Sequence, residues 1–307
     1  MNRLAGIVVA VIGFIVAISS VLKVIPSLTS TGVALILLGG LVIGLSFVDK
    51  PDAGGTERMP TPLTLANIFV SPGEVFQNLR RHPRWLVAVL MMSVLSAVYF
   101  NAFQYRLGPD RVAGFALDKT KEMSFMTEEA RTQIEASRPQ TLEDNRNPVL
   151  RAGQAVNGFV GMTFWLAFLG GVFFLFAMAM GGVLNYWQAF AAAVYSTFAF
   201  SVIRFVLNMI VLFIKDPTDV HPITGQSSLI QDNLSFLVSA ADNPVVYTLL
   251  ASFSLLGFYW IWMNVTGLTN AGEKVSSSTA WTATLSVFFG LVFLGLIAAL
   301  LFPSFIS

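Results

Sequence analysis

The sequence predicts an all-α polytopic membrane protein: a five-helix transmembrane bundle preceded by an interfacial helix and an N-terminal two-helix hairpin. Hydrophobic residues make up 55% of the 307 residues and charged residues 11%, against about 25% charged in an average soluble domain. Seven apolar runs also have about the length of a membrane-spanning helix, the form in which backbone groups are satisfied within lipid. The predicted spans are 4–22, 32–48, 86–103, 155–179, 187–214, 245–263 and 280–302.

The first two runs predict a transmembrane hairpin over residues 1–48. The basic start followed by an apolar run also resembles a signal peptide, but the run is long and a second one follows at once. We therefore expect a retained hairpin, with its turn at 23–29 around Pro26. Gly40 and Gly44 have a spacing that lets helices approach closely. Because glycine is common in spans, this motif is either a packing seam or incidental.

A linker over residues 49–62 is predicted to separate the hairpin from the domain at 63–307. The segment combines proline, glycine and mixed charge and has no periodic apolar face, which is typical of a connection rather than a helix.

A short helix over residues 72–82 is the strongest local signal in the chain. Ser71, Pro72 and Glu74 fit a capping box with proline at the first helical position, and Pro83 ends the pattern. Its apolar and polar faces predict a helix lying along the membrane interface. The basic residues at its end are either lipid or partner contacts at headgroup level, or an ordinary juxtamembrane connector: Arg80, Arg81 and Arg84.

The stretch 106–151 is the only long hydrophilic segment, and it holds equal numbers of basic and acidic residues. Thr127 is predicted to cap a helix from 128 to about 137, stopped by Pro139. We interpret the stretch as a solvated helical connector. A partner-binding element is the alternative.

Arg204 lies well inside the fifth predicted span, where an unpaired cation costs a few kcal/mol or more. No Asp or Glu lies inside any other predicted span, so its partners should be neutral side chains, a backbone carbonyl or a lipid phosphate. We expect Arg204 to face the bundle interior, with Asn208 and Asn264 as the best candidate partners. It either holds helices together or lines a polar groove for a lipid or small solute.

Catalytic and cofactor motifs are missing from the sequence. There is no cysteine and hence no thiolate or cysteine metal site, and HExxH, P-loop, GxGxxG and GxSxG patterns are absent. His82 and His221 are far apart in the sequence. We therefore predict no catalytic residues, no cofactor and no metal, and the net charge of +1 indicates no nucleic-acid partner.

Charge leaves the orientation open. An inside N-terminus places most juxtamembrane cations in the cytoplasm, as the positive-inside rule favours. It also places the basic residues of 106–151 outside, which the same rule disfavours.

Several segments resemble the Ypt-interacting-protein (YIP) domain family, specifically its bacterial branch, over about residues 64–302. The residues that carry the resemblance are Ile68–Phe76, Arg81–Trp85, Trp187–Tyr195, and Gly267 with the following polar loop and Ala280. The resemblance implies a cytoplasmic amphipathic segment, five clustered helices and an outer C-terminus in the bacterial cytoplasmic (inner) membrane. Family members in eukaryotes bind Rab-type GTPases. That implication is not carried over, because this chain shows no separate cytoplasmic domain.

Two functional hypotheses follow. The first is a non-enzymatic membrane-organising or partner-binding scaffold, whose partners are membrane lipids, membrane or membrane-associated proteins, or further copies of the chain. The second is a transporter or lipid-translocating protein with a polar groove near Arg204. A continuous polar path beside Arg204 favours the second, and a sealed apolar bundle favours the first.

Overall fold

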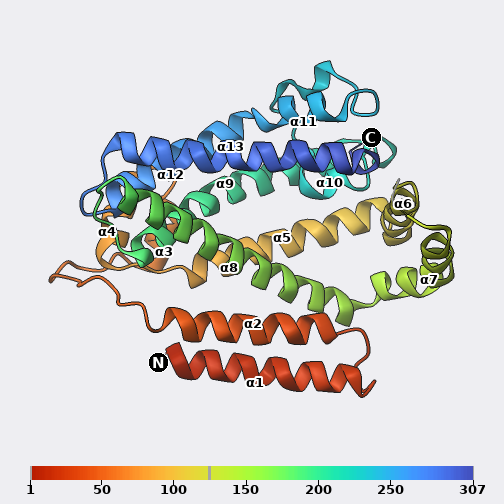
Figure 1. The fold of residues 1–307 in the computed structure, drawn as a ribbon, viewed down its shortest axis with the longest axis horizontal. Helices are drawn as coiled ribbons and strands as arrows, with labels where there is room; N and C mark the ends of the chain where they lie inside the picture. The colour runs from red at the N-terminus through yellow and green to blue at the C-terminus, as the bar shows by residue number, and fades with distance from the viewer. Residues whose placement is uncertain (1, 124–125, 307) are drawn as a thin grey trace. The chain divides into compact units, whose positions relative to one another are not determined.

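The computed structural model describes residues 2–123 and 126–306, and over these residues the fold is all-helical (Figure 1). The predicted fold class is confirmed. The α-helices are α1 Asn2–Val21, α2 Thr29–Leu45, α3 Thr61–Asn67, α4 Pro72–Arg81, α5 Leu86–Leu107, α6 Pro109–Lys121, α7 Glu128–Arg146, α8 Pro148–Ala179, α9 Tyr186–Ile214, α10 Thr224–Ser227, α11 Pro244–Ser252, α12 Leu255–Ala271 and α13 Ser277–Leu301.

Among the described residues, five helices are long and apolar enough to cross a membrane: α1, α5, α8, α9 and α13. The pair α11 and α12 passes the same test together but is bent by 47°, and α2 is apolar but has only 17 residues. A multi-pass membrane protein is therefore confirmed, while the total of seven spans stays a prediction.

The chain forms two compact units, and the division falls within α5, α9, α12 and α13. Unit 1 consists of Met1–Val94, Pro148–Ala199 and Trp262–Thr284. Unit 2 consists of Leu95–Asn147, Phe200–Ile261 and Leu285–Ser307.

Helices α1 and α2 of unit 1 lie side by side as the predicted hairpin (Figure 1). Glycines bring their backbones into close approach. A Cβ atom added to Gly13 would lie 2.6 Å from the Ile36 nitrogen, and one added to Gly39 would lie 2.5 Å from the Gly6 oxygen. Gly32 meets Ala17 in the same way. We call these contacts the hairpin seam.

The alternative seam at Gly40 and Gly44 is wrong, because a Cβ on either residue would meet nothing within 4 Å. Successive helix positions differ by about 100°, so a seam through Gly32 and Gly39 turns Gly40 away from α1. Another part of α2 packs on α8, where Gly153 lies against Thr31.

Helix α4 forms as predicted, with Pro72 in its first turn. Its apolar side chains Val75, Phe76 and Leu79 are fully buried within the protein, and Phe76 packs close to Gly267. The apolar face of α4 therefore contacts unit 1 itself rather than acyl chains.

The predicted capping box is wrong, since Ser71 makes no side-chain cap hydrogen bond. Its backbone has φ −133° and ψ 61°, outside the extended conformation in which an N-cap side chain reaches the helix N–H groups. The reason is the unpredicted helix α3 just before it. The Ser71 N–H donates to the Asn67 carbonyl at 2.8 Å.

In the hydrophilic insert, Thr127 caps α7 as predicted by accepting a hydrogen bond from the Ala130 N–H at 3.2 Å. The predicted stop at Pro139 is wrong, because α7 continues to Arg146. An internal proline removes one helical hydrogen bond. Contacts with the unpredicted helix α6 hold the remainder of α7, including the hydrogen bond from Asn145 to the Pro109 carbonyl at 3.0 Å.

The predicted span 245–263 is not one straight helix, because it breaks between α11 and α12. Asp232 from the preceding loop caps the start of α12: its carboxylate accepts from the Leu256 N–H at 2.8 Å and its carbonyl from the Leu255 N–H at 3.2 Å. Ser254 accepts from the Gly257 N–H at 2.9 Å. These acceptors satisfy the first N–H groups of a new helix.

Candidate functional site

Arg80 and Arg81 fasten α4 to the loop between α12 and α13. Arg80 donates to the Glu273 carbonyl at 3.2 Å, and Arg81 forms an ion pair with the Glu273 carboxylate at 3.3 Å. Gln188 of α9 donates to the Arg80 carbonyl at 2.9 Å. We name α3, α4 and the loop 272–276 the α4 platform. It is a fixed part of unit 1, with Glu74 and Gln77 exposed on its surface.

Arg84 is bound by the protein in a way that the sequence did not predict. Its guanidinium donates to the Met59 carbonyl at 2.6 Å, to the buried Thr64 hydroxyl, and to Thr61 at 3.3 Å. Burial lowers the pKa of Arg84, the Tyr195 hydroxyl raises it, and the nearby charge of Arg58 lowers it further. Arg84 therefore fixes the linker and α3 against the start of α5.

The linker itself is held along α4. His82 Nε2 lies 2.7 Å from the Thr56 carbonyl oxygen. Asn78 donates to the Glu57 carbonyl at 2.9 Å and accepts from the Met59 N–H at 3.2 Å. The proposed module boundary at 49–62 stays a prediction, but the segment is ordered against unit 1.

Arg204, on α9 in unit 2, has the expected type of neutral partner: it donates to the backbone carbonyl of Ser227 in α10. Its guanidinium carbon also lies 5.6 Å from the centroid of the Phe200 ring. Asn208 is not its partner. Asn208 is buried and accepts from the Leu229 N–H at 2.9 Å. Asn264 is buried and belongs to unit 1, whereas Arg204 and Asn208 belong to unit 2.

The loop between α9 and α11 folds back along α9. Arg204 precedes the end of α9 by about 15 Å of helix rise, yet it reaches the backbone of this loop. Tyr99 of α5 donates to the Gly225 carbonyl at 2.6 Å. Leu229 joins a hydrophobic cluster with Phe103 and Leu212. Irregular backbone beside a span is tolerated where it is buried in protein or lines a cavity.

A polar cavity of about 580 Å³ lies between this loop and α9. Its lining combines cationic, anionic and neutral polar groups, among them Arg204, Asp219, His221, Asp232 and Tyr247. Sequence reasoning missed this site. The available signal was a pair of acids, Asp219 and Asp232, in a loop next to apolar spans, and nothing in the sequence places that loop beside Arg204.

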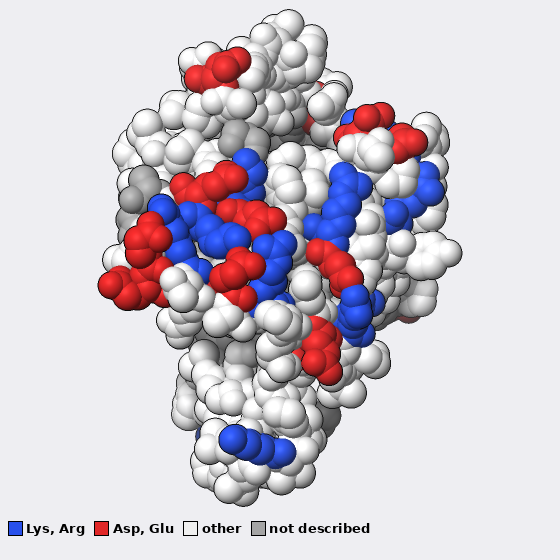
Figure 2. Space-filling model, turned by 90° about the vertical axis from the view of Figure 1, so that its right-hand side faces the viewer, with Lys and Arg blue, Asp and Glu red and all other residues white. Residues whose placement is uncertain are grey.

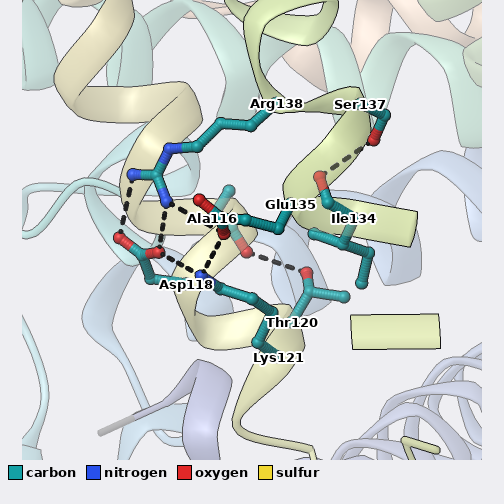
Figure 3. Close-up of polar contacts among 8 residues, drawn as sticks. All are labelled: Ala116, Asp118, Thr120, Lys121, Ile134, Glu135, Ser137 and Arg138. Carbon is teal, nitrogen blue, oxygen red and sulfur yellow. Dashed lines mark hydrogen bonds and ion pairs between the residues drawn. The ribbon is translucent and has the colours of Figure 1, made fainter. Parts of the chain in front are cut away.

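The insert formed by α6 and α7 is held by ion pairs between its two helices (Figure 3). Arg138 of α7 pairs with Asp118 of α6 at 2.8 Å. Lys121 lies 2.7 Å from Glu135 and 3.2 Å from Asp118. Figure 2, which faces the side of unit 2 that carries this insert, shows basic and acidic groups alternating across the surface. The insert is a preformed helical pair with its charges largely matched.

We expect Asp118→Asn to loosen this pair. The hydrogen bond from Arg138 lowers the pKa of Asp118, and that from Lys121 lowers the pKa of Glu135. A lowered carboxyl pKa contributes stability that is present above the unfolded pKa of about 4 and is lost as the pH falls through the folded pKa. Amide hydrogen exchange over 128–146 should therefore be faster in Asp118→Asn at neutral pH. In the parent protein, protease resistance of the insert should fall below about pH 4.

The matched control is Glu122→Gln, because the ion pair that Glu122 forms with Lys119 is local, three residues away in the same segment. Exchange in α7 that responds equally to both variants would show that the ion pairs between α6 and α7 do not hold the helices together.

These features define a multi-pass α-helical membrane protein in which a packed amphipathic helix, α4, comes just before the span α5. The family model of the Yip1 domain matches residues 66–300. The chain therefore belongs to the Yip1 domain family, and the matched region begins after the hairpin and most of α3. No curated protein and no solved structure matches the chain. Placement in the bacterial branch stays a prediction.

Proposed function

We propose that this protein is a non-enzymatic scaffold that organises the membrane by binding partners on the α4 platform. The observation that carries the proposal is the way the platform is built. Its apolar face is buried in unit 1, and hydrogen bonds from Gln188, Arg80 and Arg81 fix it in place. Since a preformed surface does not have to be ordered on binding, its polar outer face is suited to recognition.

The test is site-specific photo-cross-linking in native membranes. A photoreactive residue at Glu74, on the exposed face of α4, should give a discrete protein adduct. The matched position is Glu129, exposed at the start of α7. An adduct at twice the mass of the chain would identify a second copy as the partner. Absence of a protein adduct at Glu74, or the same adduct at both positions, would contradict the proposal.

The orientation that this role requires is itself testable. We expect a bacterial cytoplasmic membrane location with the N-terminus and residues 49–84 inside, and residues 106–151 and the C-terminus outside. Ser307 lies outside the described residues. Reporter fusions at Gly55, Gln133 and the C-terminus should report inside, outside and outside. A cytoplasmic signal at Gln133 would contradict the expected orientation and indicate the opposite one.

A second function, lipid or solute handling in unit 2, is favoured by one specific observation. The cavity beside Arg204 is polar and has about 580 Å³, within the range of about 300–1,000 Å³ typical of ligand sites. Because both signs of charge line it, a zwitterionic lipid headgroup or solute would match it best.

A further inference from the structure

A second cavity, of about 690 Å³, lies within unit 1 where α1 and α2 meet the linker and the start of α5. We call it the hairpin pocket. Its walls come from the N-terminal hairpin, which lies outside the matched Yip1 region, and from residues inside that region.

Part of the lining of the hairpin pocket is strongly basic. Its lining includes the cations Lys50, Arg58, Arg81 and Arg84, together with His82. None of the lining residues is Asp or Glu in the part of the chain that the structure describes. This concentration of one sign of charge leaves the pocket without an internal counter-ion and favours an anion.

Two of these cations, Lys50 and Arg81, are held in place by the surrounding structure. Lys50 Nζ lies 5.2 Å from the centroid of the Trp187 ring. Trp187 in turn donates from its indole to the Val48 carbonyl at 2.9 Å, which fixes the end of the hairpin. Arg81 keeps its ion pair with Glu273. Lys50 and Arg81 are therefore preorganised.

Arg58 and Arg84 give independent support for an anion. Each lines the pocket, and the Arg58 charge lowers the pKa of Arg84, as expected for two cations close together. Arg84 Nε is buried and donates to no acceptor among residues 2–123 and 126–306. A bound anion between them would relieve this repulsion.

Another part of the lining is apolar. Ala5 and Val9 of α1, Leu38 and Val42 of α2, and Leu86 of α5 line it. These residues belong to helices with the composition of membrane spans. A basic mouth beside an apolar wall matches a molecule with an anionic head and a hydrocarbon tail.

We propose that the hairpin pocket binds one anionic phospholipid, with its phosphate held by Lys50, Arg58 and Arg84 and one acyl chain lying against α1, α2 and α5. The N-terminal hairpin is then half of a lipid site that the Yip1 domain completes. This lipid site does not depend on the partner-binding role of the α4 platform, so an experiment can contradict either proposal without contradicting the other.

The test is titration of the full-length protein in detergent with phosphatidylglycerol, followed by native mass spectrometry. Phosphatidylcholine and inorganic phosphate serve as parallel probes. Phosphatidylglycerol should bind in preference to phosphatidylcholine with a stoichiometry of one. Near a membrane surface each basic residue contributes about fivefold in affinity. The double variant Lys50→Gln/Arg58→Gln should therefore bind phosphatidylglycerol roughly 30-fold more weakly.

The matched control is Lys23→Gln, in the turn between α1 and α2 and outside the pocket lining. It should bind like the parent protein, and thermal unfolding should confirm that both variants are folded. If the double variant does not fold, Ala5→Phe, which adds bulk to the apolar part of the lining, should weaken phosphatidylglycerol binding while leaving phosphate binding unchanged.

Equal binding of both lipids, or equal losses in the double variant and in Lys23→Gln, would mean unselective lipid around the spans and overturn the proposal. Inorganic phosphate binding as tightly as phosphatidylglycerol would also overturn it, because the apolar wall would then contribute nothing.

Discussion

Gly13→Leu is expected to force α1 and α2 apart and to destabilise the N-terminal hairpin strongly. A Cβ atom at Gly13 would lie 2.6 Å from the Ile36 nitrogen and 2.7 Å from the Gly32 oxygen. Both are backbone atoms, which cannot rotate away as a side chain can. Overpacking of a tight interface costs about 1–3 kcal/mol, and a backbone clash should reach the upper end. Hydrogen exchange of α1 and thermal unfolding in detergent measure the loss.

The control for this prediction is Gly40→Leu, which adds the same side chain to α2. Nothing lies within 4 Å of a Cβ at this position, so stability should stay within about 0.5 kcal/mol of the parent. A large loss from Gly40→Leu together with a small one from Gly13→Leu would show that the helices pair through the GxxxG face.

The hairpin illustrates how far sequence reasoning reaches. Two apolar runs joined by a turn around Pro26 predict two paired helices, but they do not set the rotation of each helix. Glycines occur on more than one face of α2, and only Gly32 and Gly39 meet small residues of α1. The choice of face depends on the complementary glycines and alanines of both helices together, a pattern wider than any single motif.

Local signals predicted where several helices begin, and they failed where distant residues intervene. Pro72 and Thr127 mark true helix starts because first-turn proline and N-cap threonine act within one turn. Pro139 does not stop α7, because contacts with α6 hold the helix beyond the proline. Helix α6 comes from earlier in the chain, so a local pattern does not reveal these contacts. Likewise, Asp232 caps α12 from a separate loop.

The candidate residues show the same limit. The cost of burying a cation directed attention to Arg204 and to a neutral partner. The partner is a backbone carbonyl in a loop whose position depends on Tyr99, Phe103 and Asn208, and no short-range pattern encodes that placement. Arg80 and Arg81 were expected either to contact lipid or a partner or to belong to an ordinary juxtamembrane connector. The structure shows that each also forms a bond to Glu273.

Arg204→Met and Asn208→Leu should separate ligand binding from structure within one turn of α9. Asn208 is buried and satisfies the Leu229 N–H, so Asn208→Leu leaves a buried donor without an acceptor and should cost about 1–3 kcal/mol. Arg204 faces the polar cavity, where water can bind the Ser227 carbonyl in its place. Arg204→Met also removes a cation whose desolvation is unfavourable. It should therefore leave the protein about as stable as the parent.

The second readout is the lipid that co-purifies in mild detergent. If the cavity beside Arg204 holds a zwitterionic headgroup, Arg204→Met should lose that lipid while thermal unfolding stays unchanged, because the cation supplies the phosphate contact. Asn208→Leu should lower the unfolding temperature and loosen the loop over 224–235. Unchanged lipid in a fully stable Arg204→Met protein would remove the lipid-handling hypothesis for unit 2. If Arg204→Met loses as much stability as Asn208→Leu, the role of Arg204 is structural: its bond to the Ser227 carbonyl would hold the loop against α9.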